Sequence, residues 1–111
     1  MRLFGLKTCD TCRKALKEIA AAGGRAEFHD IRAELDAARL DGWLSRVGVE
    51  ALVNRRSTTW RGLSEAERAA ADGAGAAALL LANPALIKRP VIEAEAGLFV
   101  GWDDAARAAL L

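Results

Sequence analysis

A Cys-x-x-Cys motif, Cys9 to Cys12, lies near the start of the chain between two different hydrophobic patterns. Residues 3–6 before it form an apolar run with the length of a short buried strand. Residues 10–22 after it are amphipathic with helical spacing and end at Gly23-Gly24. Residues 26–31 then alternate in polarity, which predicts a second strand. Together these segments predict a β-α-β unit whose strands pair in parallel through a right-handed crossover.

The middle of the chain has the pattern of a block of helices. Asp36 begins a predicted helix to about residue 47, because apolar side chains recur along one stripe and Gly48 follows. A polar loop covers residues 54–61. Ser64 and Glu67 have the spacing of a capping box for a short helix to about residue 71, and residues 76–82 predict another helix that ends at Asn83-Pro84. We therefore expect a helical insertion over about residues 36–83.

The last part of the chain returns to strands. Pro90 leads into a predicted strand over residues 91–94, and residues 95–97 turn the chain into a second strand over 98–101. Asp103 caps a final helix to about residue 109. The order β-α-β, helices, β-β-α predicts an α/β, thioredoxin-like fold in which one domain, residues 1–111, carries the helical insertion.

Composition excludes several classes of protein. The length of 111 residues suits a single domain, and 16 Lys and Arg against 15 Asp and Glu give a net charge of +1. That balance provides no basic stripe, so we expect no direct nucleic-acid partner. Two cysteines are too few for a disulfide scaffold. The sequence shows no signal peptide and no apolar run long enough to span a membrane, so we expect a cytoplasmic protein that does not bind membranes.

The position of the Cys pair favours thiol chemistry. Cys9 stands where a helix begins, and the free N–H groups and the positive end of the helix dipole there stabilise a thiolate. We therefore predict Cys9 as a nucleophile. Cys12 lies about one helical turn further, within reach of a disulfide, and is the predicted resolving thiol. Arg13 and Lys7 add positive charge near Cys9, whereas Asp10 opposes it.

Two alternatives explain the same cysteines without redox chemistry. They could be an inert structural pair, or half of a zinc site. A closed zinc site needs four ligands, and His29 is the single histidine that could join them. We therefore expect no metal, and we interpret His29 as a structural residue. We likewise assign Trp43, Trp60 and Trp102 to packing.

An arginine group is the second chemical feature. Guanidinium groups suit the recognition of carboxylates and oxyanions. We predict that Arg56 and Arg89 bind an anionic substrate, because they precede a short helical block and a Pro-led strand. Arg55 and Arg61 could equally be solvated surface residues.

The chain opens with Leu-Phe-Gly-Leu-Lys-Thr-Cys-Asp-Thr-Cys-Arg-Lys-Ala at residues 3–15, and further distinctive segments cover residues 28–32, 52–61, 83–90 and 100–102. Together these segments resemble the arsenate reductase-like (ArsC) family. That family includes glutaredoxin-coupled arsenate reductases, Spx-type transcription regulators and a YffB-like branch. Thr-Thr-Trp-Arg at residues 58–61 looks most like the YffB-like branch.

The resemblance implies a thioredoxin fold with a helical insertion and assigns roles to three residues. Cys9 matches the catalytic cysteine of the family. Arg89 matches an active-site arginine, and Pro90 matches a cis-proline that faces the Cys motif and leaves backbone groups free to pair with a bound peptide or glutathione.

The sequence also departs from the family pattern. The arsenate-active branch usually carries Ser at the position of Cys12 and three arginines around its oxyanion. Arg89 matches one of these, Asn54 stands at the second, and the third has no match near residues 99–103. The Cys-x-x-Cys motif itself resembles Spx regulators, in which the pair is a redox switch and the protein binds RNA polymerase.

These observations predict a thiol-disulfide oxidoreductase with glutathione as co-substrate. Cys9 would attack a disulfide or glutathione mixed disulfide, and Cys12 or glutathione would resolve the intermediate. No tightly bound cofactor is expected, and glutaredoxin is a candidate partner. The alternatives are an Spx-type redox-sensing regulator that binds RNA polymerase, and an arsenate reductase proper.

Overall fold

The computed structural model describes residues 1–111, and the chain divides into two compact units. The first unit combines both ends of the chain, Met1–Glu34 and Arg89–Leu111, and the second unit is the continuous segment Leu35–Lys88. The predicted thiol motif and the Pro-led strand both belong to the first unit. No helix in residues 1–111 is long and apolar enough to cross a membrane.

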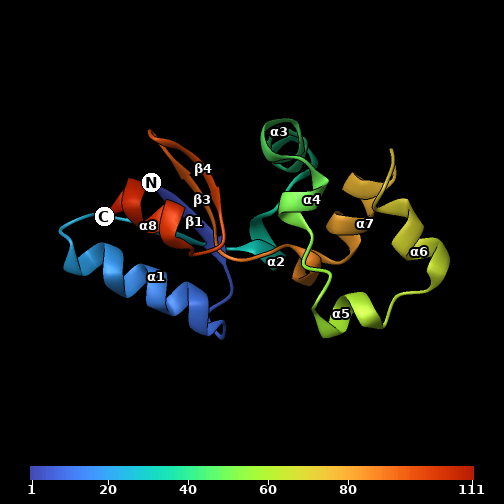
Figure 1. The fold of residues 1–111 in the computed structure, drawn as a ribbon, viewed down its shortest axis with the longest axis horizontal. Coiled ribbons are helices and arrows are strands. Elements are labelled where there is room, and N and C mark those ends of the chain that lie inside the picture. Colours follow the sequence, from blue (N-terminus) through green and yellow to red (C-terminus); the bar gives the residue numbers. More distant parts are fainter. The chain divides into compact units, whose positions relative to one another are not determined.

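The first unit contains a four-stranded mixed sheet in the order β2-β1-β3-β4 (Figure 1). Its strands are β1 (Arg2–Gly5), β2 (Glu27–Asp30), β3 (Val91–Ala94) and β4 (Gly97–Val100). The strand β1 pairs in parallel with β2 and antiparallel with β3, and β3 pairs antiparallel with β4. The predicted β-α-β unit and C-terminal hairpin are therefore confirmed, within an α/β fold.

The turn of the hairpin is shorter than predicted. Gly97 belongs to β4, where it pairs with Ala94, so only Glu95 and Ala96 lie between the strands. Gly97 has φ 142°, a conformation that a residue with a Cβ rarely adopts. The tight turn therefore depends on this glycine.

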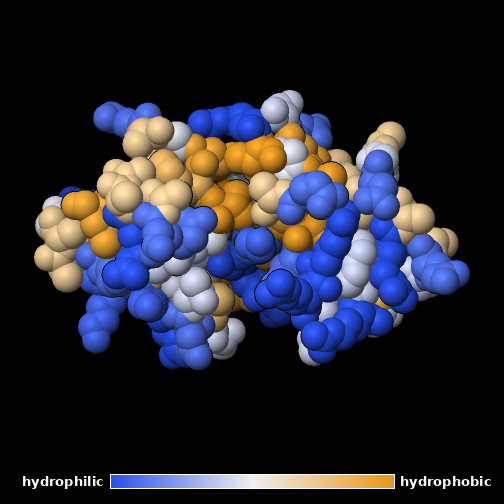
Figure 2. All heavy atoms as spheres, in the orientation of Figure 1, coloured by the Kyte–Doolittle hydropathy of each residue, from blue (hydrophilic) through white to orange (hydrophobic).

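Helix α1 (Asp10–Ala21) covers one face of the sheet with its apolar side. Cys12, Ala15 and Ile19 are buried against Leu3 and Ile92 of the central strands. Helix α8 (Asp104–Leu110) adds Leu110 to the same cluster. Figure 2 shows hydrophilic side chains over the outward surface of α1. This arrangement places the start of α1 beside the end of β1, where the Cys motif lies.

The prediction that β2 continues to Ile31 was wrong, because the chain turns into the single-turn helix α2 (Ile31–Glu34). The Asp30 carboxylate accepts a hydrogen bond from the Arg32 N–H (2.8 Å), and the Glu34 carboxylate accepts one from the Asp30 N–H (2.8 Å). These local bonds satisfy backbone donors that a longer strand would have left at the sheet edge.

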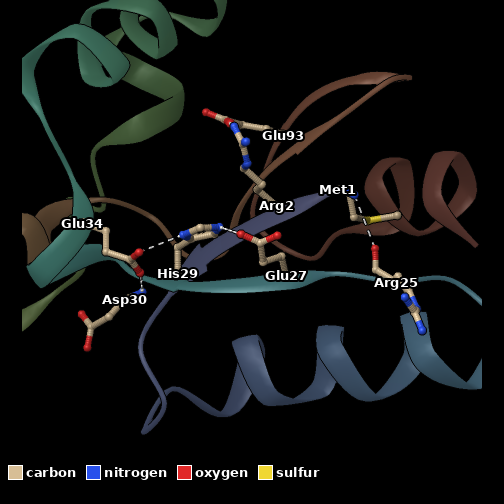
Figure 3. Close-up of polar contacts among 8 residues, drawn as sticks. All are labelled: Met1, Arg2, Arg25, Glu27, His29, Asp30, Glu34 and Glu93. Atoms are coloured by element: carbon tan, nitrogen blue, oxygen red, sulfur yellow. Dashed lines mark hydrogen bonds and ion pairs between the residues drawn. The ribbon is translucent and has the colours of Figure 1, made fainter.

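His29 connects the end of β2 to α2 (Figure 3). Its ring stacks on Phe4 with centroids 4.8 Å apart, and its Nδ1 lies 3.0 Å from the Glu34 carboxylate. Its Nε2 is 2.8 Å from a Glu27 oxygen, an ion-pair distance without hydrogen-bond geometry. The contacts support the interpretation of His29 as a structural residue.

The second unit is helical. It contains α3 (Ala37–Val47), α4 (Val49–Leu52), α5 (Thr58–Arg61), α6 (Glu65–Ala70), α7 (Ala76–Ala82) and a 3-10 turn, η1 (Pro84–Leu86). Asp36 caps α3 by accepting from the Arg39 N–H (2.7 Å), and Ser64 and Glu67 form the predicted capping box. The sequence pattern missed α4, α5 and η1, because one turn is too short to show an apolar period.

Hydrophobic side chains of these helices form a second cluster of buried residues. Trp43 of α3 is 2% exposed, as predicted for a packing residue, and α3 packs against α7. A single β-bridge joins Val53 to Ile87, and the Lys88 N–H donates to the Leu52 carbonyl (2.7 Å). These contacts tie the last residues of the unit to α4.

Candidate active site

Cys9 occupies the N-cap position of α1, directly after the turn that follows β1. Its backbone N–H donates to the Leu6 carbonyl at 3.0 Å and closes this turn, and its carbonyl accepts from the Arg13 N–H at 3.0 Å. The side chain is half-buried and makes no cap hydrogen bond. Part of the thiol is therefore accessible, while its backbone is fixed.

The pKa of Cys9 is lowered from its ordinary value of 9.0, although burial by itself would raise it. Interactions with the N–H and the thiol of Cys12, a hydrogen bond from Arg89 and the charge of that guanidinium together outweigh the burial. Donors and a nearby positive charge stabilise a thiolate more than a thiol. Cys9 is thus the more acidic of the two thiols.

Cys12 has the opposite environment. It is 0% exposed, and burial raises its pKa to about 11, with the hydrogen bond to Cys9 and the charge of Cys9 acting in the same direction. Interactions with the Leu6 backbone and with Arg89 oppose that shift. The two thiols are reduced and of unequal acidity.

Gly5, which the sequence analysis did not select, makes room for this thiol. A Cβ at Gly5 would collide with the Cys12 sulfur and would lie 3.2 Å from its Cβ. The sulfur therefore packs directly on the backbone of β1. A glycine inside a strand pattern often marks such a close approach, and this signal was present in the sequence.

Arg89 and Pro90 directly precede β3. The peptide bond between them is cis, as the family resemblance implied. Pro90 is buried, and its carbonyl accepts a hydrogen bond from the Gly101 N–H at 2.7 Å. The structure thus brings Arg89, which is distant in the sequence, to the Cys9–Cys12 motif.

Arg13 is not oriented as the sequence analysis expected. Its guanidinium binds the Asp10 carboxylate at 2.7 Å, and both side chains are exposed. An arginine neutralised by its neighbour contributes little positive charge to Cys9. The groups that lower the pKa of Cys9 are instead Cys12 and Arg89.

Arg56 belongs to the second unit, where it lines a pocket of about 440 Å³ with Glu50, Val53, Asn54, Arg55 and Lys88. Its backbone N–H donates to the Asn54 side chain at 3.1 Å. Arg55 is bound to Glu50 and Asp72, both at 3.0 Å, and lies over the ring of Trp60. Arg55 is therefore a structural residue, and an anion-binding role for Arg56 stays a prediction.

The sheet order, the Cys-x-x-Cys motif at the start of α1 and the cis-proline at the start of β3 define a thioredoxin-like protein. Within that class, the chain belongs to the ArsC family, whose model matches residues 4–110. The family predicted from the sequence segments is confirmed.

Individual relatives agree with this assignment. A protein of Haemophilus influenzae, named only as uncharacterized, is 39% identical over 103 residues, which are 92% of this chain and 90% of the relative. The structure of a YffB protein is 38% identical with a TM-score of 0.85 and covers 99% of this chain and 98% of its own. An arsenate reductase (ArsC) related protein from Brucella melitensis is 41% identical with a TM-score of 0.78, over 97% and 91%. The likeness to YffB agrees with the branch that residues 58–61 suggested.

Proposed function

We propose that the protein is a thiol-disulfide oxidoreductase that uses glutathione as co-substrate and Cys9 as nucleophile. The observation that carries the proposal is the position of Cys9 at the N-cap of α1, together with the lowered pKa of its thiol, to which Cys12 and Arg89 contribute. An inert structural pair does not need an arginine on one sulfur. A low-pKa thiol at a helix start is the typical nucleophile of thiol exchange.

The proposed reaction has two exchanges. The Cys9 thiolate attacks the glutathione sulfur of a mixed disulfide, a bond forms between Cys9 and glutathione, and the substrate leaves as a thiolate that takes up a proton. A second glutathione then attacks the glutathionyl sulfur, leaves as glutathione disulfide and restores the Cys9 thiolate. Alternatively, Cys12 attacks the Cys9 sulfur and releases glutathione, and two further glutathione molecules reduce the resulting Cys9–Cys12 disulfide. Arg89 and Arg56 would hold the carboxylates of the substrate, and Pro90 would orient it beside Cys9.

The proposal also covers the location of the protein, its cofactors and its partners. We propose a cytoplasmic enzyme without a tightly bound cofactor, for which glutaredoxin is a candidate partner. Neither nucleic acid nor a membrane has a role in it.

The decisive assay measures reduction of a glutathionylated model peptide by glutathione, with wild type and Cys9→Ser compared. We expect turnover by wild type and background rates with Cys9→Ser, because an alcohol at this position does not form the nucleophile. Circular dichroism shows whether the variant is folded. Equal rates for the two proteins, or no turnover by wild type, would contradict the proposal.

An anion-binding role of Arg56 has its own test. Arg56→Ala should raise KM for the glutathionylated peptide about tenfold, the effect of losing one charged hydrogen bond, without changing kcat. Arg61→Ala, which removes the same charge from an exposed position at the end of α5, is the control. An unchanged KM in Arg56→Ala would show that this residue is not part of the binding site.

Two rival functions are distinguished by separate assays. An Spx-type regulator would bind RNA polymerase in a way that depends on oxidation of the thiols, and such binding without turnover would replace the proposed enzyme. An arsenate reductase would reduce arsenate with glutathione and glutaredoxin. The chain carries Cys12 and Asn54 where that branch has Ser and Arg, so we expect no arsenate reduction.

A further inference from the structure

We infer that the free edge of β4 is a docking site for an extended segment of another protein, and that this segment carries Lys or Arg at both ends of a short uncharged stretch. The segment would pair with Leu98 and Val100 and add a further strand to the four-stranded sheet. The inference concerns the edge of the sheet and does not depend on the proposed thiol chemistry.

Two residues of β4 direct their backbone hydrogen-bonding groups away from the sheet. β4 is the last strand in the order β2-β1-β3-β4 and pairs with β3 alone. The Gly101 N–H donates to the Pro90 carbonyl at 2.7 Å, and in an antiparallel pair every second residue takes part in such bonds. Phe99 therefore faces β3, whereas Leu98 and Val100 present their N–H and C=O groups at the edge. No other hydrogen bond of the chain uses these groups.

The opposite edge of the same sheet is protected. β2 carries charged or ionisable side chains at three of its four positions, and the Glu34 carboxylate accepts from the Asp30 N–H at 2.8 Å. Charged side chains are a usual device that keeps an edge strand from pairing with another chain. β4, with the sequence Gly-Leu-Phe-Val, has no charged residue and no proline. Of the two edges, β4 is thus the one left open to a further strand.

The side chains of β4 also leave apolar surface for a partner to cover. Leu98, Phe99 and Val100 are each half-buried, whereas most of β1 and the first half of β3 are buried. Phe99 packs on the cluster beneath α1, and Leu98 pairs with Glu93, whose carboxylate lies 4.0 Å from the Arg2 guanidinium. An added strand would remove the remaining apolar area of these side chains from water, which favours association.

The charges at the two ends of this edge define the chemistry of the partner. Glu95 lies in the hairpin turn before β4, Asp103 and Asp104 follow β4, and all three are exposed. No Lys or Arg occurs in residues 90–106. The edge therefore has an uncharged middle between two acidic ends. A complementary segment has basic ends, because like charges opposite one another destabilise a strand pair and opposite charges stabilise it.

A second copy of the chain fits this edge less well. If two β4 strands paired about a two-fold axis with Leu98 opposite Val100, the same register would bring Glu95 of each copy toward Asp103 of the other. Two pairs of like charges would then meet in one symmetric interface. Charge complementarity therefore favours a basic segment of a different protein over self-association.

Two short peptides test the docking site. Both are fluorescein-labelled and alternate valine and threonine, and one carries two lysines at each end where the other carries two glutamates. Fluorescence anisotropy measures the binding of each peptide to the wild-type protein. We expect the lysine-ended peptide to bind at least about tenfold more tightly, with a difference that shrinks as salt is added. Equal binding of the two peptides, or no binding of the lysine-ended peptide up to about 1 mM, would overturn the inference.

A proline at the edge tests the strand pairing. Leu98→Pro removes one N–H that points away from β3, so the bonds between β3 and β4 stay intact. It should weaken binding of the lysine-ended peptide at least about fivefold, the effect of one lost hydrogen bond. Leu98→Val keeps the N–H and is the matched control, with binding as in wild type. Equal affinities of Leu98→Pro and Leu98→Val would contradict pairing at this edge.

A charge reversal tests the acidic end. Glu95→Lys should weaken binding of the lysine-ended peptide about threefold, because attraction becomes repulsion. Asp41→Lys, the same reversal at an exposed position of α3, is the control and should bind as wild type does. If circular dichroism shows that Leu98→Pro does not fold, this pair of variants decides, and equal affinities would overturn the inference.

Amide hydrogen exchange measured by NMR locates the bound peptide. The amides of Leu98 and Val100 should exchange fast in the free protein and slowly with the lysine-ended peptide, whereas the amide of Phe99, already bonded to β3, should change little. Protection elsewhere but not at these two amides would show that the site is wrong. Protection that rises with protein concentration in the absence of peptide would show that a second copy occupies the edge, and would overturn the inference as well.

Discussion

At the scale of single residues, the charge of Arg89 affects the pKa of Cys9, and the small volume of Gly5 makes room for the Cys12 sulfur. Burial by itself raises the pKa of Cys9, and Arg89 is the cation that opposes it. Gly5 leaves the space that the sulfur of Cys12 fills. Both residues are therefore positions where one substitution changes the chemistry of the motif.

Arg89→Ala should raise the pH midpoint of Cys9 alkylation by about one unit, because both a hydrogen bond and a positive charge are lost. Arg89→Lys should raise it less, since the charge stays but the planar guanidinium does not. Arg25→Ala, the same loss of charge at an exposed site after α1, is the matched control. Equal midpoints for Arg89→Ala and Arg25→Ala would show that Arg89 does not lower the pKa of Cys9.

Gly5→Ala should destabilise the protein by about 1–3 kcal/mol, the usual cost of overpacking a core, because the new methyl group overlaps the Cys12 sulfur. Gly42→Ala is the matched control, since a Cβ there in α3 meets nothing within 4 Å. That change should stabilise by up to about 1 kcal/mol through helix propensity. Urea unfolding measures both. A Gly5→Ala variant as stable as wild type would contradict the close packing.

At the scale of helices and strands, the sequence predicted elements that have their own end signals. Asp36, Ser64 and Asp103 each accept a hydrogen bond from the N–H three residues later, and all three helices were predicted. The helices that the sequence did not predict are single turns. One of them, α2, forms where the second strand was predicted to end. Their formation depends on local bonds such as that from the Trp60 N–H to Ser57, which leave no periodic pattern.

Ser64→Ala should destabilise α6 by about 1 kcal/mol, because the N-cap oxygen that accepts from the Glu67 N–H at 3.1 Å is lost. Ser45→Ala, inside α3 and exposed, is the control and should be neutral or slightly stabilising. Amide hydrogen exchange over residues 65–70 reports the effect. Unchanged exchange in Ser64→Ala would show that the capping box does not hold this helix.

In the candidate site, too, some features were predictable from the sequence and others depend on the three-dimensional fold. The spacing of Cys9 and Cys12 and the Pro-led strand were readable along the chain, and the family resemblance supplied the cis bond before Pro90. The contact of Arg89 with Cys9 depends on β3 lying beside β1, which residue spacing does not encode. The i,i+3 spacing of Asp10 and Arg13 allows an ion pair to be predicted, but it does not show whether the two side chains actually meet.

At the scale of the whole molecule, the two cysteines should give stability an unusual dependence on pH. The pKa of Cys9 lies below 9.0, so the folded state binds fewer protons than the unfolded state just below that pH, and stability rises as pH approaches 9. The pKa of Cys12 is raised to about 11, so the folded state keeps its proton above pH 9. Stability then falls by about 2–3 kcal/mol between pH 9 and 11.

Urea midpoints under reducing conditions, measured from pH 7 to 11, test this prediction. Relative to wild type, Cys9→Ser should lack the rise below pH 9 and Cys12→Ser should lack the fall above it. Other titrating groups are common to all three proteins, so the differences isolate the thiols. Parallel curves for wild type and both variants would contradict the opposed environments of the two cysteines.

The sheet is assembled from both ends of the chain, since β1 lies between β2, made early, and β3, made late. During synthesis on the ribosome, the first 34 residues must wait for more than half of the chain before their central strand gains its second neighbour, whereas Leu35–Lys88 is continuous and can fold as it emerges. Arg89 arrives only then. The nascent chain therefore carries Cys9 without the hydrogen bond and charge of Arg89 until the C-terminal part of the first unit is made.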